Sequence, residues 1–182
     1  MKILIFEFIF KVISTINIRL SLILKKNSSH ESDIEMILKP EDFTKLNFNL
    51  PSDYKLRYFC EEDLLSFYLL MTKINMGFCP LSFWKKYILP GGFFVVEDIN
   101  KNKIIGTGFA AIHPESMENE VGTLEWLACH PDYGGIGIGS LISTKISERL
   151  IDEEFKTIRL TTQKHRKKAI SMYEKLGWHI KR

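Results

Sequence analysis

Four glycines stand in the short stretch between an apolar strand pattern and an amphipathic helix pattern, and this loop constrains the fold more than any other part of the chain. The strand pattern runs from Val121 to Cys129, the loop from His130 to Gly139, and the helix pattern from about Ser140 to Ile151. Glycine lets the backbone approach a ligand without obstruction by Cβ, and the free N–H groups at a helix start face anions. The loop therefore predicts a pyrophosphate cradle, with a tight turn that binds nothing as the alternative.

Two common phosphate-binding motifs do not fit the spacing of this loop. A P-loop places lysine directly after its last glycine, but Gly139 is followed by Ser140. A dinucleotide fingerprint needs a third glycine where Ile142 stands and an acid at the end of the next strand, where Thr162 stands. Both classes of nucleotide-binding protein are excluded.

The order of predicted elements places antiparallel strands first and a βαβ crossover second. Asp98–Asn102 forms a turn signal between two strand patterns, which predicts a β-hairpin. Gly77 and Gly177 each follow a helical pattern and end it. The expected strands are 55–60, 93–97, 103–112, 121–129, 156–162 and 178–182, and the expected helices are 61–75, 80–88, 140–151 and 167–176. The fold class is therefore α/β (α+β), with a mixed central sheet.

Residues 1–24 form an apolar N-terminal segment ahead of the predicted domain, which covers 54–182. Glu7, Lys11 and Arg19 interrupt the apolar runs, so a membrane span is excluded, and no small-residue cleavage site completes a secretory signal. The polar residues recur at helical spacing, which predicts an amphipathic helix. Three interpretations stay open: a dispensable or mistranslated extension, a helix that contacts a membrane surface or the protein itself, and a targeting peptide.

Residues 25–53 predict a polar linker with little structure of its own. The stretch from Lys25 to Asp33 is almost entirely polar, and Pro40 and Pro51 follow it. We therefore expect the folded domain to begin at Tyr54.

Charge and cysteine content exclude three further classes of protein. Lys and Arg total 25 against 22 Asp and Glu, and a net charge of +3 is too small for a protein that neutralises many phosphates of a nucleic acid. Cys60, Cys79 and Cys129 form no CxxC pair and no cluster with histidine, which excludes a disulfide framework and a structural zinc site. A reducing compartment is favoured, and we expect a cytoplasmic protein without a metal, membrane-associated if the N-terminal segment binds lipid.

Two motifs in the second half of the chain carry a family resemblance. Gly134–Gly139 reads Gly-Gly-Ile-Gly-Ile-Gly, and Ala169–Trp178 reads Ala-Ile-Ser-Met-Tyr-Glu-Lys-Leu-Gly-Trp. The first resembles the acetyl-coenzyme A loop, Gln/Arg-x-x-Gly-x-Gly/Ala, of the Gcn5-related N-acetyltransferase (GNAT) family, with Gly134 in place of the usual Gln or Arg. The second resembles the family motif A-x-x-x-Y-x-x-x-G-F, with Trp178 for Phe. The resemblance covers residues 55–182.

The resemblance implies a GNAT fold in which the strands on either side of the crossover helix splay apart to hold acetyl-CoA. Backbone groups of the first splayed strand are expected to pair with the pantetheine arm, and the glycine loop with the pyrophosphate. Arg166, in the basic cluster 164–168, is the candidate for the 3′-phosphate. The residues implied to bind the coenzyme are Leu127, Ala128, Cys129, Gly134, Gly135, Ile136, Gly137, Ile138, Gly139, Ser140 and Arg166.

The implied activity is direct transfer of acetyl to a primary amine of a small molecule or peptide. An alkylammonium has a pKa of about 10 and needs a base to become a nucleophile. Glu125, the sole acid in its strand pattern, is the candidate base, and a solvent-facing or ion-paired residue is the alternative. Tyr173 matches the family tyrosine near the thioester sulfur and is the candidate acid, with a packed aromatic as the alternative. Glu120 and His113 are weaker candidates for the base, and Cys129 is interpreted as a small buried thiol.

A second hypothesis is a degenerate, non-catalytic coenzyme A-binding domain. The family normally continues through one more strand after the position of Arg182, so we expect a sheet that lacks a C-terminal strand and exposes an edge. Such an edge also makes a homodimer an open alternative. The sequence does not identify the acceptor amine.

Overall fold

The computed structural model describes residues 4, 5, 8, 9, 11, 12, 33–76, 79–116 and 120–181. In these residues a mixed sheet has the strand order β2-β3-β4-β5-β6-β1-β7. The strands are β1 (Asp33–Leu38), β2 (Tyr54–Tyr58), β3 (Ile88–Asp98), β4 (Lys103–Ile112), β5 (Val121–Cys129), β6 (Thr157–Gln163) and β7 (His179–Ile180). The helices are α2 (Leu64–Lys73), α3 (Leu81–Trp84), α4 (Ile138–Ile151) and α5 (Lys167–Lys175), with short 3-10 turns η1 (Pro40–Asp42), η2 (Glu61–Asp63) and η4 (Pro131–Tyr133). The predicted mixed-sheet fold is confirmed.

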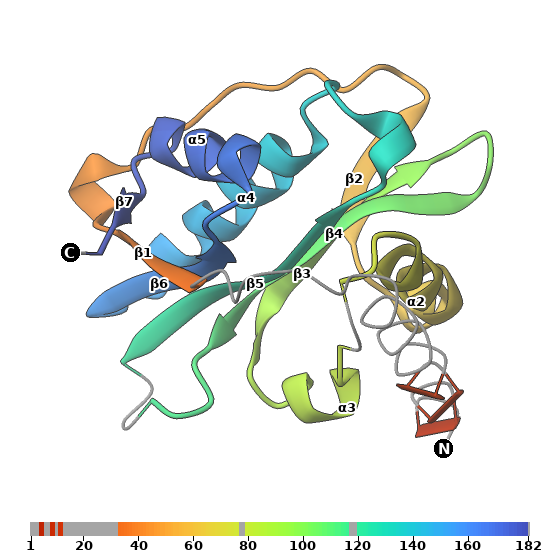
Figure 1. The fold of residues 1–182 in the computed structure, drawn as a ribbon, viewed down its shortest axis with the longest axis horizontal. Helices are drawn as coiled ribbons and strands as arrows, with labels where there is room; N and C mark the ends of the chain where they lie inside the picture. Colours follow the sequence, from red (N-terminus) through yellow and green to blue (C-terminus); the bar gives the residue numbers. More distant parts are fainter. Residues whose placement is uncertain are drawn as a thin grey trace, which may run out of the picture.

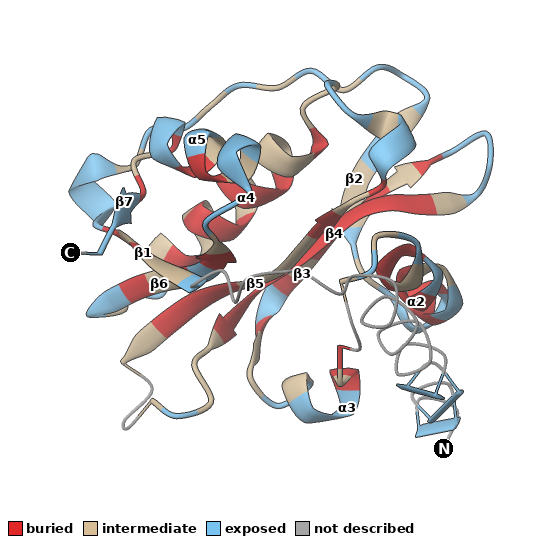
Figure 2. Ribbon diagram, viewed as in Figure 1, coloured by how far each residue is buried: buried red, intermediate tan, exposed pale blue. Residues whose placement is uncertain are grey.

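Helices cover the sheet on both faces (Figure 1), and each face has its own apolar core. On one face, Ile142, Ile146 and Leu150 of α4 are fully buried at a spacing of one helical turn, against β3, β4 and β5. On the other face, Phe67 and Met71 of α2 pack on β3 and β4. Buried residues line the central strands and the inner sides of the helices in Figure 2. The sheet is therefore a rigid layer from which functional side chains can project.

The strand between β6 and β7 comes from the N-terminal part of the chain, and this differs from the prediction of a polar linker over 25–53. β1 pairs antiparallel with β6 from Asp33, opposite Gln163, to Leu38, opposite Ile158. On its other side it pairs with β7, where Met36 lies opposite Ile180. The sequence also predicted that the sheet lacks a strand after residue 182 and exposes an edge. In the described residues β7 is the outermost strand on that side, and β1 lies between it and β6.

Residues 39–53, which we call the strap, cross the α4 and α5 face of the molecule on their way to β2 (Figure 1). Phe43, Leu46 and Leu50 pack against the core there. The backbone N–H of Thr44 donates to the carbonyl of Leu176 at 3.1 Å. The sequence missed this docking because apolar residues spaced along irregular backbone show no period.

Two predicted boundaries shift because β3 begins earlier than expected. Ile88 already pairs with Ala111 of β4, so the strand starts before Pro90 rather than at Phe93. The second predicted helix, 80–88, consequently ends at Trp84, as α3. The predicted β-hairpin is confirmed as β3 and β4.

Six residues of the N-terminal segment are described, and they are helical and exposed. The rest of residues 1–24 lies outside the described residues, so the amphipathic helix and its membrane contact stay predictions. No helix in the described part of the chain is long and apolar enough to cross a membrane.

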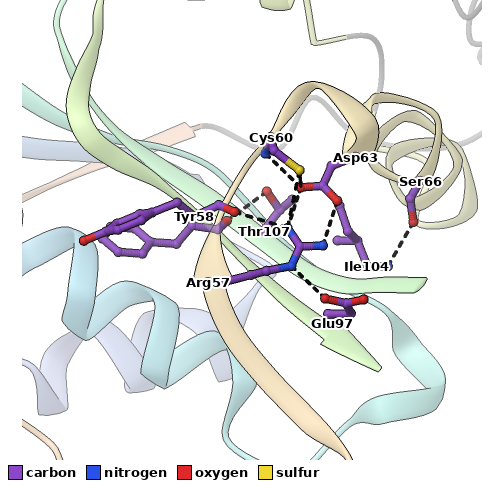
Figure 3. A network of polar contacts seen from close by, with 9 residues as sticks. Arg57, Tyr58, Cys60, Asp63, Ser66, Glu97, Ile104 and Thr107 are labelled. Carbon is purple, nitrogen blue, oxygen red and sulfur yellow. Dashed lines mark hydrogen bonds and ion pairs between the residues drawn. The ribbon is translucent and has the colours of Figure 1, made fainter. Parts of the chain in front are cut away.

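A polar network around Arg57 fastens β2 to the start of α2 (Figure 3). The guanidinium donates to both carboxylate oxygens of Asp63, at 2.6 and 2.8 Å, and through Nε to Glu97 at 2.7 Å. The Cys60 N–H donates to Asp63 at 2.9 Å. Burial alone would raise the pKa of Asp63, but these hydrogen bonds outweigh it and lower the pKa below its usual value.

We expect Asp63→Asn to destabilise the fold by about 2 kcal/mol at pH 7, because it leaves Arg57 with a poorer, uncharged partner. Since folding lowers the pKa of Asp63, its contribution is present above the ordinary carboxyl pKa and is lost as pH falls through the lower folded value. Urea unfolding at pH 7 and below pH 4 measures this. Glu61→Gln, on the same turn but exposed, is the control. An equal loss at both pH values would contradict the role of the charge.

Candidate active site

The parallel strands β5 and β6 separate after three residue pairs, and the site lies in the gap. Val121 pairs with Thr157 and Thr123 with Arg159, and no pairing continues beyond them within the described strands. A β-bulge accompanies the separation, because Trp126 and Leu127 together lie opposite one residue of β4. Trp126 has a φ of 52°, which is strained for a non-glycine residue. The edge of β5 that faces β6 is thereby left open from residue 124 onward.

A cavity of about 370 Å³ occupies this gap. Five segments supply its walls: β5, β6, α5 with its N-cap, the first residue of β1, and the turn after α2. The lining residues are Asp33, Met76, Leu124, Glu125, Trp126, Leu127, Thr161, Thr162, Gln163, Arg166 and Tyr173. Both predicted catalytic residues, Glu125 and Tyr173, are among them.

Glu125 is a mostly buried carboxylate on the wall formed by β5. Burial raises its pKa to about 7, against smaller opposing effects of the Thr123 hydroxyl and the Arg159 charge. A carboxyl group with this pKa accepts and releases protons near neutral pH. The alternative of an ion-paired residue does not apply, since no described cation lies within ion-pair distance of it.

Tyr173 enters the same cavity from α5. Its ring is 5% exposed and contacts Trp178 edge to face, with the centroids 6.2 Å apart. Burial raises the pKa of its hydroxyl, with a smaller contribution from Cys129. The hydroxyl therefore stays protonated at neutral pH and is an O–H donor. The alternative interpretation of Tyr173 as a packed aromatic also applies, because the residue belongs to the apolar core and lines the cavity as well.

The glycine loop follows β5 as the turn η4 and then enters α4. Gly135 has a φ of +86°, and no described atom lies within 4 Å of where its Cβ would stand. Gly137, with a φ of +85°, is the N-cap of α4 and offers no side chain to the first-turn N–H groups. An open cradle beside uncapped N–H groups fits a pyrophosphate.

Members of the basic cluster line different hollows. Arg166 lines the main cavity and donates through Nε to Gln163 at 3.1 Å. Lys167 and Lys168 instead line a neighbouring hollow of about 410 Å³, next to Ser140 at the start of α4. Lys175 lines it too and was not singled out from the sequence, although its spacing of seven from Lys168 puts both on one helical face.

Other sequence candidates lie outside the cavity. Glu120 is ion-paired with Lys156. His113, whose pKa is lowered by burial and by Arg159, does not line it either. Cys129 borders the loop, and burial raises its pKa to about 12, so the thiol is a poor nucleophile. Leu127 is the member of the 127–129 trio that lines the cavity.

Sequence reasoning missed Asp33, which belonged to the predicted linker. The alternation of Asp33 and Glu35 with Ile34 and Met36 is a strand signal that would have found it. No group of acidic, histidine and cysteine side chains suited to a metal ion occurs among residues 33–76, 79–116 and 120–181.

A separated pair of parallel strands, a glycine loop at a helix start and a mixed sheet define the GNAT fold, and solved structures share it. One is an acetyltransferase of the GNAT family from Novosphingobium aromaticivorans, described as putative (16% identity, 82% of this chain, 60% of that chain, TM-score 0.60). Another is a GCN5-related N-acetyltransferase from Sphaerobacter thermophilus (16% identity, 90% and 53%, TM-score 0.63). A third is an acetyltransferase from Trypanosoma brucei (21% identity, 71% and 95%, TM-score 0.58).

The sequence agrees with the structural likeness. The family model described as "Acetyltransferase (GNAT) family" matches residues 57–178, and the chain belongs to this family. No curated protein sequence is significantly similar to the chain. The chain spans 60% and 53% of the lengths of the first two structures.

Proposed function

We propose that the chain transfers the acetyl group of acetyl-CoA to a primary amine of a small molecule or peptide. The observation that carries the proposal is that Glu125 and Tyr173 line one cavity, between the separated strands β5 and β6. One is a base whose pKa burial brings to about 7, and the other is a protonated donor. Acyl transfer from a thioester to an ammonium requires both functions.

The chain's own residues supply the binding of the coenzyme. The open edge of β5, at Leu127, Ala128 and Cys129, would pair with the amide groups of the pantetheine arm. The N–H groups from Gly134 to Ser140 would hold the pyrophosphate, and Arg166 and the nearby lysines would face the remaining phosphate. When bound, the coenzyme supplies an activated acetyl thioester.

Two side chains, Glu125 and Tyr173, then carry out the proton transfers. Glu125 takes a proton from the acceptor ammonium, so that the nitrogen lone pair can attack the acetyl carbon. As the N–C bond forms, the C–S bond breaks, and the second proton leaves the nitrogen to solvent. Tyr173 donates its hydroxyl proton to the departing sulfur and regains one from water.

Calorimetry and a thiol-release assay test the proposal. We expect the full chain to bind acetyl-CoA at micromolar to millimolar concentration, and to release coenzyme A thiol in the presence of amines. A panel of polyamines, amino acids, aminoglycosides and peptide N-termini covers the acceptor classes. No binding at millimolar acetyl-CoA would refute the proposal, and binding without turnover on any amine would favour the non-catalytic coenzyme-binding domain.

Cys129→Ala should retain acetyl transfer, with a rate within about threefold of the original. A thiol whose pKa lies near 12 carries almost no thiolate at neutral pH and forms no acetyl-enzyme. Steady-state kinetics and intact mass after incubation with acetyl-CoA measure this. A mass increase of one acetyl group that disappears in the variant would instead indicate a covalent route.

A further inference from the structure

Asp33 brings a second carboxylate into the candidate active site. It is the first residue of β1 and lines the cavity together with Glu125. Its side chain is exposed, and no ion pair holds it among the described residues. The other acid of β1, Glu35, is by contrast paired with Lys181 at 2.9 Å and Arg159 at 3.8 Å. Asp33 is thus the carboxylate of this strand that stays free for a ligand.

The two carboxylates project from the same face of the sheet. Met36 and Leu124 pack in the core under α4 and α5, so their strands turn residues 33 and 125 to the opposite face. Asp33 lies opposite Gln163, whereas Glu125 would be level with Thr161 if the register of β5 and β6 continued. Two strand spacings and two residue rises separate their Cα atoms by at least about 12 Å.

Arg166, the cation on the cavity wall, makes no ion pair with Asp33 among the described residues, although it reaches Gln163, the residue opposite Asp33. Arg166 stands at the N-cap of α5, on the helix that carries Tyr173, and is hydrogen-bonded to Gln163. The cavity therefore has two carboxylates without an ion-pair partner among the described residues, Asp33 and Glu125, across a span that suits a chain of several carbon atoms.

We propose that Asp33 binds a second cationic group of the acceptor, so that the preferred substrate class is a molecule with two amines separated by a flexible chain. The inference rests on the proposed function. One ammonium pairs with Asp33 while the other delivers its proton to Glu125, and a charge-assisted hydrogen bond at Asp33 improves binding of a diamine about tenfold over a monoamine. Asp33 is a specificity-determining residue and takes no part in the proton transfers.

Three acceptors of equal chain length test this on the full chain: hexamethylenediamine, hexylamine and ε-aminocaproate. We expect kcat/KM to be about tenfold higher for the diamine than for hexylamine, beyond the factor of two from its second amine, and lowest for ε-aminocaproate. Asp33→Asn should reduce the preference to that factor of two, and Asp33→Lys should favour ε-aminocaproate. Asp152→Asn, an exposed change outside the cavity, is the matched control.

The readouts separate this inference from the proposed function. Acetyl-CoA affinity and hexylamine turnover of the original chain report on the proposed function, whereas the ratio of diamine to hexylamine turnover reports on Asp33. If acetyl-CoA binds but no amine turns over, the role of Asp33 is tested by calorimetry of hexamethylenediamine binding to the coenzyme A complex. The affinity for hexamethylenediamine is expected to fall about tenfold in Asp33→Asn. Equal use of diamine and monoamine by the original chain, or an unchanged preference in Asp33→Asn, would overturn the assignment.

Discussion

Glu125→Gln should lower kcat/KM for amine acceptors by about a hundredfold to ten-thousandfold, the usual contribution of a general base. The amide has the size of the carboxylate and still fills its place on the β5 wall, but it cannot accept the proton of an ammonium. Because the proposed role of Glu125 is toward the acceptor amine and not toward the coenzyme, acetyl-CoA affinity measured by calorimetry should stay within about twofold.

The pH profile identifies the residue more sharply than the rate does. With a pKa of about 7 for Glu125, kcat/KM should rise as pH increases through about 7 and the carboxylate forms. In Glu125→Gln this rise of kcat/KM with pH should be absent. Glu120→Gln, which changes an exposed acid paired with Lys156, should keep it. If kcat/KM still rises through pH 7 in Glu125→Gln, the base is another group, with His113 as the next candidate.

Stability gives a second, independent measure of the same carboxyl. Folding raises the pKa of Glu125 from 4.5 to about 7, so the native state loses stability as pH rises through that interval and a buried charge forms. Glu125→Gln removes the charge. The variant should therefore be about 3 kcal/mol more stable relative to the original at pH 8 than at pH 4, measured by urea unfolding.

Gly135→Glu should weaken acetyl-CoA binding by about a hundredfold, since it places a negative charge in the anion cradle. No described atom lies within 4 Å of the position of the new Cβ, so the side chain starts in open space. Its backbone cost is that of a non-glycine residue at a φ of +86°, about 1–2 kcal/mol. Calorimetry with acetyl-CoA and thermal unfolding measure the two effects separately.

Gly91→Glu is the matched control for this change. Gly91 has a φ of +66° in β3, and its Cβ would stand 4.0 Å from the nearest ring atom of Tyr58. The control should lose similar stability and keep its affinity for acetyl-CoA. Equal loss of affinity in both variants would mean that the loop acts through the fold and not as an anion site.

The sequence predicted those elements whose sequence patterns lie within a few consecutive residues. The apolar strand that ends at Cys129, the glycine loop and the amphipathic helix α4 each carry their pattern within a few residues, and the structure has them in that order. Tyr173 was predicted from the second motif and Glu125 as the sole acid of its strand pattern, and both line one cavity. Their roles in catalysis stay predictions until the kinetics above are measured.

The parts that the sequence did not predict depend on partners far along the chain. β1 is six residues long, follows a polar stretch, and gains its hydrogen bonds only from β6 and β7. Asp33 could enter the site only once that pairing was known. Likewise, the φ of +52° at Trp126 arises from a bulge against β4, and nothing in the residues around it marks a left-handed conformation.

The insertion of β1 between β6 and β7 has a consequence for the order of folding. During synthesis β1 leaves the ribosome before the other strands, yet both of its neighbours are made last. It stays unpaired while β3, β4 and β5 form their hairpins, and closing so long a loop is entropically costly and slow. We expect amide hydrogen exchange during refolding to protect β3 and β4 first and β1 last, with the acceptor side of the site completed in the final step.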